Sequence, residues 1–125
     1  MKVSQIMNKA IVSDDNISIK QAAKIMSDKN IGSLIILNEN KICGLVTERD
    51  VLKNVSKLNL KVKNIMSKNV FVIDKNSNIE EAASLMAEKK IKRLPVVEDK
   101  KLVGLISVTD VIANSKSINE NFLFE

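Results

Sequence analysis

The sequence predicts an α+β fold made of two copies of one βαββα repeat. Three observations support this prediction. The chain matches itself at an offset of 60 residues, which is the signature of an internal repeat. Each half has one apolar stripe at helical spacing, and the remaining apolar runs have the length of buried strands. The stripes are too narrow for one repeat to cover its own sheet, so we expect the two copies to complete the core together.

The repeat is visible as residues that recur in the same order. Gly44 falls on Gly104, and most substitutions between such pairs exchange like for like, as in Thr47 and its counterpart Ser107. On this basis we predict four segments: repeat 1 at residues 1–57, a polar connector at 58–63, repeat 2 at 64–115 and a C-terminal tail at 116–125.

Spacing predicts the first helix of each repeat. Four apolar residues at positions i, i+3, i+4 and i+7 form one stripe: Ile19, Ala22, Ala23 and Met26 in repeat 1, and Ile79, Ala82, Ala83 and Met86 in repeat 2. Ser18 and Asn78 precede these helices as N-caps, and Gln21 and Glu81 are their expected capping-box partners.

Short apolar runs predict the strands. One run opens each repeat, at residues 10–12 and at residues 70–73. After the helix, runs at 34–37 and 42–46 flank a polar turn, as do runs at 94–97 and 102–106. This pattern is typical of a β-hairpin. A second helix is expected to begin at Thr47 and at Ser107.

Composition excludes several classes of function. The chain has no His and therefore lacks the commonest general base and metal ligand. Its one cysteine, Cys43, lies in an apolar run and can form neither an internal disulfide nor a thiolate zinc site. We therefore predict no catalytic residue, no metal site and no enzyme activity. The unpaired thiol and the lack of an apolar signal segment predict a cytoplasmic protein that does not associate with membranes.

Two motifs occur in both repeats at fixed spacing. Each repeat closes with Gly-apolar-apolar-Ser/Thr-x-x-Asp, at residues 44–50 and 104–110, and the segment 31–36 has its counterpart at 91–97. In these residues the chain resembles a tandem pair of cystathionine-β-synthase (CBS) domains. The resemblance implies repeats related by a pseudo-twofold axis, with adenosine ligands in clefts between them. It also implies a homodimer, head-to-head or head-to-tail, that forms a disc of four repeats.

The Ser/Thr-x-x-Asp motif has two roles that can coexist. By local chemistry it is close to a capping box, in which the hydroxyl caps a helix and the acid favours the positive helix end. The resemblance implies a ligand role, in which Asp50 and Asp110 accept hydrogen bonds from the two ribose hydroxyls. A carboxylate suits a vicinal diol because it accepts two hydrogen bonds at once. Thr47 and Ser107 then face ribose or phosphate.

The resemblance further implies that each site takes its acid from one repeat and its adenine-binding residues from the other. The first site then contains Thr47, Asp50, Val70, Phe71, Ile91, Lys92 and Arg93, and the second contains Ser107, Asp110, Ile11, Val12, Ile31, Gly32 and Ser33. Lys92 and Arg93 supply charge for a phosphate, unless they are solvent-exposed members of a basic run. Phe71 suits core packing and adenine contact equally.

Other recurring residues suggest packing. Gly44 and Gly104 are expected to serve a bulge or a close approach within a strand, not ligand contact. The methionines at matched positions, Met7, Met26, Met66 and Met86, are expected to fill the core.

These features favour a regulatory module, with no fused catalytic domain, that senses an adenosine-containing ligand such as AMP, ADP or ATP. An adenine nucleotide is then a regulatory ligand, no cofactor is required, and the signal passes to a protein partner or through self-association. S-adenosylmethionine or an NAD-type ligand is an alternative. The net charge of +5 also suits nucleic acid, but there is no aromatic stacking platform and no basic helix face to support that alternative.

Overall fold

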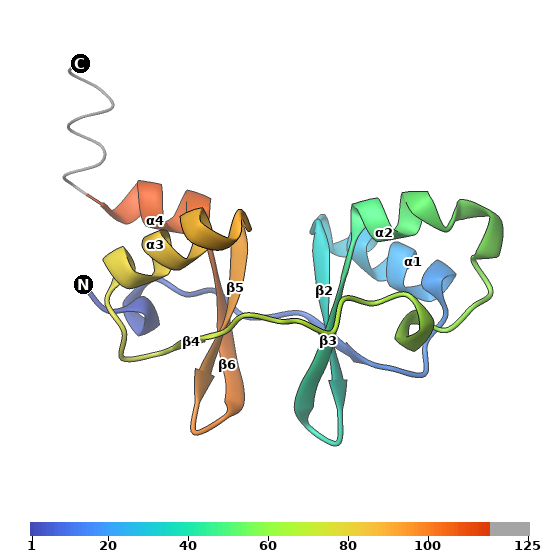
Figure 1. The fold of residues 1–125 in the computed structure, drawn as a ribbon, viewed down its shortest axis with the longest axis horizontal. Helices are drawn as coiled ribbons and strands as arrows, with labels where there is room; N and C mark the ends of the chain where they lie inside the picture. Colours follow the sequence, from blue (N-terminus) through green and yellow to red (C-terminus); the bar gives the residue numbers. More distant parts are fainter. Residues whose placement is uncertain (116–125) are drawn as a thin grey trace, which may run out of the picture. The chain divides into compact units, whose positions relative to one another are not determined.

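The computed structural model describes residues 1–115 and contains two compact units (Figure 1). Among the described residues, unit 1 consists of Met1–Ala10 together with residues 71–115, and unit 2 consists of Ile11–Val70. Each unit has the βαββα order that the sequence predicts, so the fold class is confirmed. The predicted C-terminal tail lies outside the described residues.

Unit 2 is a three-stranded sheet with two helices on one side (Figure 1). Strand β2 lies in the middle, with β1 parallel and β3 antiparallel to it. The elements of this unit are β1 (Val12–Asp14), α1 (Ile19–Lys29), β2 (Ser33–Asn38), β3 (Lys41–Thr47), α2 (Glu48–Lys53) and the 3₁₀ helices η2 (Val55–Lys57) and η3 (Val62–Asn64).

Unit 1 repeats this arrangement around the middle strand β5. The register of the two hairpins agrees, since Ile36 pairs with Gly44 as Val96 pairs with Gly104. The elements are η1 (Val3–Gln5), β4 (Ile73–Asp74), α3 (Ile79–Lys89), β5 (Arg93–Glu98), β6 (Lys101–Ser107) and α4 (Val108–Asn114).

The first helix of each unit begins at the predicted N-cap. Ser18 forms a full capping box, because Gln21 N donates to Ser18 Oγ at 3.1 Å and Ser18 N donates to Gln21 Oε1 at 2.8 Å. Asn78 Oδ1 accepts a hydrogen bond from Glu81 N at 2.9 Å. The Glu81 side chain is exposed and does not return the bond, so the predicted capping box at α3 is wrong in this half.

The predicted hairpins are present, with tighter turns than the sequence suggested. Two loop residues connect the strands, and both have positive φ: 51° and 65° at residues 39–40, and 50° and 68° at residues 99–100. Turns of this type match the twist of the strands that they join. The outer residues of the predicted turn, Asn38 and Lys41, pair with each other in the ladder instead.

The opening strands begin later than predicted. β1 starts at Val12, where pairing with Ile35 of β2 begins, and β4 starts at Ile73. The apolar residues before Ile73 form no strand, and Phe71 and Val72 are each 40% exposed. An apolar run forms a strand only where a neighbouring backbone offers partners for its N–H and C=O groups. The hydropathy of the run does not indicate whether such a neighbour is present.

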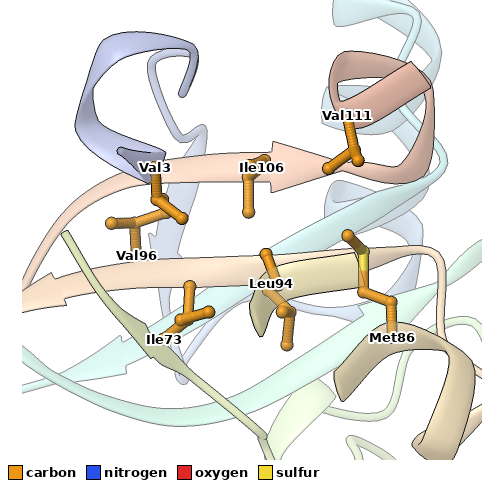
Figure 2. Packing of buried hydrophobic residues seen from close by; sticks show 8 residues of the cluster. Val3, Ile73, Met86, Leu94, Val96, Ile106 and Val111 are labelled. Atoms are coloured by element: carbon orange, nitrogen blue, oxygen red, sulfur yellow. The ribbon is translucent and has the colours of Figure 1, made fainter. Parts of the chain in front are cut away.

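Each unit has a buried aliphatic cluster between its sheet and its helices. The cluster of unit 1 (Figure 2) comprises Val3, Ile73, Ala82, Met86, Leu94, Val96, Ile106 and Val111. The cluster of unit 2 comprises Ala22, Met26, Leu34, Ile36, Val46 and Val62. Met26 and Met86 fill these clusters as predicted and are 4% and 2% exposed.

The segments that precede the opening strands β1 and β4 in sequence are part of these clusters. Val3 is fully buried in unit 1, and its N–H donates to Ser77 O at 2.8 Å. Val62 is fully buried in unit 2, and its N–H donates to Ile17 O at 2.9 Å. The segment 58–63, expected to be a polar connector, therefore supplies a core residue to unit 2.

Gly44 and Gly104 allow a methionine from these segments to lie against the sheet. A Cβ atom at Gly104 would lie 2.6 Å from Met7 Sδ, and a Cβ atom at Gly44 would overlap Met66 Sδ. Neither glycine has a positive φ. Glycine is therefore required here for close packing, as the sequence predicts, and not for a special backbone conformation.

Candidate functional site

In unit 2 the end of β3 and the start of α2 hold Thr47 and Asp50 in a reciprocal capping box. Asp50 Oδ2 accepts hydrogen bonds from Thr47 N at 2.9 Å and from Thr47 Oγ1 at 3.1 Å, while Asp50 N donates to Thr47 Oγ1 at 3.3 Å. Both residues are half-buried. Within the described part of the chain no hydrogen bond reaches Asp50 Oδ1, so this oxygen lies outside the cap.

The corresponding turn of unit 1 has the same backbone geometry. The N-cap Ser107 has φ −117° and ψ 164°, against −114° and 165° for Thr47. Asp110 Oδ2 accepts from Ser107 N at 2.9 Å, and Asp110 N donates to Ser107 Oγ at 3.1 Å. The capping role expected from local chemistry is therefore present in both units.

The two turns differ at the second carboxylate oxygen. Asn8 Nδ2 donates a hydrogen bond to Asp110 Oδ1 at 3.0 Å. Two backbone bonds hold Asn8 beside this turn: Asn8 N donates to Leu105 O at 2.8 Å, and Leu105 N donates to Asn8 O at 2.9 Å. Sequence reasoning missed Asn8. The available signal is a difference between the repeats, since Asn8 aligns with Ser67 when Met7 is placed on Met66.

In unit 2, the residues at the start of β2 lie beside the Thr47 turn. Ser33 pairs with Thr47 across the hairpin, and Glu48 N donates to Gly32 O at 3.1 Å. Ser33 is buried, and Ile31 is half-buried against the core. These residues present no charge, as the sequence indicates.

In unit 1, the equivalent residues are basic and exposed. Arg93 pairs with Ser107 across the hairpin, and Val108 N donates to Lys92 O at 2.9 Å. The side chains of Lys92 and Arg93 are exposed and form no ion pair with any described residue. Ile91 is half-buried against the core of this unit. Two cationic side chains without an ion-pair partner among the described residues therefore lie near the junction of β6 and α4 at Ser107.

The remaining predicted contact residues are only partly buried. Ile11 packs against the core of unit 2, Val70 is half-buried, and Val12 is 39% exposed. Phe71 lies outside the buried cluster of unit 1, and Lys89 Nζ lies 5.0 Å from the centroid of its ring. The core-packing role considered for Phe71 thus finds no support within its own unit.

The structure divides the predicted site residues between the two units. Unit 2 contains Thr47, Asp50, Ile11, Val12, Ile31, Gly32, Ser33 and Val70, and unit 1 contains Ser107, Asp110, Phe71, Ile91, Lys92 and Arg93. Each ligand set implied by the resemblance draws on both groups, and both sets remain predictions.

Cys43 does not have the environment of a reactive thiol. It is half-buried at the bulge of β3, where the ladder skips from Gly44 to Ile42. Burial, followed by the negative charge of Asp15, raises the pKa of its thiol and so favours the unreactive neutral form.

Among the described residues, no three His, Cys, Asp or Glu side chains gather to hold a metal ion. Every helix in the same part of the chain is too short or too polar to span a membrane.

Known sequences similar to this chain cover most of its length. The sequence model of the CBS domain matches residues 3–57 and again residues 62–117. The 17.7 kDa protein from the bps2 3′ region of Acidianus ambivalens is 33% identical over 115 residues, which are 88% of this chain and 70% of that protein. Homoserine O-acetyltransferase of Methanohalobium evestigatum is 35% identical over 112 residues, but these span 87% of this chain and only 23% of that enzyme.

Two solved structures are similar over nearly their full length. The CBS domain pair of protein MJ0100, in complex with 5′-methylthioadenosine and S-adenosyl-L-methionine, has a TM-score of 0.83 and 31% identity, covering 90% of this chain and 94% of that one. CBSX2 in complex with AMP has a TM-score of 0.82 and 28% identity, covering 94% of this chain and 98% of that one.

Proposed function

The chain belongs to the CBS domain family, and on this premise we propose that it binds an adenosine-containing ligand through Asp50 and Asp110. CBS domain pairs are ligand-sensing regulatory modules. In the proposal each carboxylate accepts hydrogen bonds from the ribose hydroxyls of one ligand. Adenine nucleotides are the preferred ligands, and the response passes to a protein partner or through self-association.

The observation that carries the proposal is the carboxylate geometry shared by the two units. A capping bond from the backbone to Oδ2 holds each Asp side chain in place, while Oδ1 takes no part in the cap. An ionised carboxylate has about four acceptor positions, so it can cap a helix and still accept hydrogen bonds from a diol. Capping and ribose binding are therefore compatible at Asp50 and at Asp110.

The ligands of the two similar structures support adenosine as the recognised group. MJ0100 holds 5′-methylthioadenosine and S-adenosyl-L-methionine, and CBSX2 holds AMP. These ligands share the adenosine core and differ in the group on its 5′ carbon. We propose that residues that differ between the repeats select the 5′ group. Lys92 and Arg93 favour a phosphate at the first site, and Gly32 and Ser33 occupy the matching positions of the second site.

Titration calorimetry with adenosine tests the role of the two acids. Asp50→Ala and Asp110→Ala should each weaken binding at one site by about 1.5–3 kcal/mol, because each removes a charged acceptor. The double variant should be weakened at both sites. These substitutions also remove a helix cap, which costs about 0.5–2 kcal/mol of stability, so folding of each variant is checked by thermal unfolding.

Ser18→Ala is the matched control. It removes a capping box of the same kind from α1, and it should lower stability to a similar extent while leaving adenosine affinity unchanged. If the folded double variant binds adenosine as tightly as the wild-type protein, capping is the whole role of the two acids.

A further inference from the structure

Asn8 distinguishes the two proposed ribose acceptors. We infer that Asn8 competes with the ribose for Asp110, so that the Asp50 site fills first and the Asp110 site fills only at higher ligand concentration. This inference rests on the proposed function and adds a difference in affinity between its two sites. The competing residue comes from the N-terminal segment of unit 1, outside both Ser/Thr-x-x-Asp motifs.

The hydrogen bonds to the two carboxylates are distributed differently. At Asp50, both donors are on Thr47 and both reach Oδ2, so Oδ1 has no partner among the described residues. At Asp110, Ser107 N donates to Oδ2 and Asn8 Nδ2 donates to Oδ1. An incoming diol therefore finds one oxygen of Asp50 with no hydrogen-bond partner among the described residues, whereas on Asp110 it must share both oxygens with donors already present.

The donors also differ in how readily they can leave. The Thr47 hydroxyl can rotate its proton away from Asp50 while its oxygen still accepts the bond from Asp50 N, because hydroxyl hydrogens turn to suit their partners. The Asn8 amide cannot release Asp110 by turning a single proton, because its hydrogens are fixed in the plane of the amide group. Two hydrogen bonds to Leu105 hold its backbone in place, so clearing Asp110 requires the exposed side chain to rotate away as a whole.

The backbone at the matching position of unit 2 is the same. Leu45 N donates to Ser67 O at 2.9 Å, and Ser67 N donates to Leu45 O at 3.0 Å, which reproduces the pairing of Asn8 with Leu105. Serine has a shorter side chain, and within the described residues it makes no hydrogen bond to Asp50. The difference between the sites therefore depends on one side chain, and it can be exchanged.

A reciprocal exchange tests the inference, with adenosine as the probe in titration calorimetry. In a chain carrying Asp50→Ala, the Asp50 site is weakened, and Asn8→Ser should tighten adenosine binding at the Asp110 site about three- to tenfold. In a chain carrying Asp110→Ala, the Asp110 site is weakened, and Ser67→Asn should weaken binding at the Asp50 site by a similar factor. Asn8→Ala provides a second variant without the amide, should Asn8→Ser disturb folding.

The control ligand is 2′,3′-dideoxyadenosine, which lacks both ribose hydroxyls. It cannot compete for the carboxylate, so its affinity should be the same with and without Asn8→Ser. A gain with this ligand equal to the gain with adenosine would show that Asn8 acts by some other route and would overturn the inference.

The inference and the proposed function fail in different ways. If the Asp variants lose binding as proposed but the exchange leaves adenosine affinity unchanged, or changes it in the opposite direction, only the role of Asn8 is wrong. If the wild-type protein does not bind adenosine, or the Asp variants bind it as the wild type does, the proposed function is wrong and the inference falls with it.

Discussion

At the scale of single residues, the two units differ in charge beside otherwise equivalent turns. Lys92 and Arg93 are exposed and unpaired among the described residues, and Gly32 and Ser33 occupy the matching positions of unit 2. A guanidinium matches the geometry of phosphate oxygens better than an ammonium does. We therefore expect Arg93 to contribute more than Lys92 to any phosphate preference.

Arg93→Ala should reduce the ratio of AMP affinity to adenosine affinity about three- to tenfold, because a charge-assisted hydrogen bond to phosphate is lost. The ratio is measured by calorimetry in a chain carrying Asp110→Ala, which leaves the site assigned to Asp50. Raising the salt concentration should also lower this ratio in the wild-type site, because salt screens the attraction between the exposed cation and the phosphate. Lys101→Ala, at the far end of the same hairpin, is the control, and an unchanged ratio in Arg93→Ala would mark Arg93 as surface charge.

At the scale of elements, the long helices of the two units end in the same way with different residues. Asn30 follows α1 with φ 53°, and Lys90 follows α3 with φ 57°. Both positions are left-handed, a conformation that Asn tolerates and that costs most other residues about 1–2 kcal/mol. The helix end of unit 1 is therefore the more strained of the two.

Lys90→Gly should raise the free energy of unfolding by about 0.5–1 kcal/mol, since glycine adopts positive φ without a steric penalty. Part of the gain is offset by the greater entropy of glycine in the unfolded chain. Urea unfolding measures the change. Asn30→Gly is the matched control and should have a smaller effect, so equal gains from the two substitutions would contradict this explanation.

At the scale of the whole molecule, the compact units do not coincide with continuous halves of the chain. Unit 1 includes Met1–Ala10, and Val3 within this segment is fully buried among residues of the second repeat. Val62 plays the equivalent part in unit 2. The N-terminal segment therefore stabilises the unit that is formed mainly by the second repeat.

Val3→Ala should destabilise unit 1 by about 2 kcal/mol, because it removes two buried methyl groups from a closed cluster. Amide hydrogen exchange should then accelerate in β5 and β6 and change little in β2 and β3. Val62→Ala should give the reverse pattern. If both variants accelerate exchange equally in both sheets, each core is not specific to its own unit.

Local patterns in the sequence were sufficient to predict the repeat, the helices, the hairpins and the capping role of the Ser/Thr-x-x-Asp motif. Helical periodicity, cap residues and turn residues act over a few positions along the chain, so one sequence contains the whole signal. The spacing of Ser107 and Asp110 is enough to place a carboxylate against a backbone amide. The same spacing in two copies also indicated the CBS family.

Only the tertiary structure decided which distant segments meet. It placed Val3 and Val62 in the two cores, began β1 at the residue where β2 offers a partner, and brought Asn8 within 3.0 Å of Asp110. Such contacts join residues with no fixed spacing in the chain, and their stability comes from burial and from hydrogen bonds completed by a remote backbone. The periodicity of the sequence does not identify that remote partner. The hydrogen bond from Asn8 that distinguishes Asp110 from Asp50 is therefore visible only in the fold.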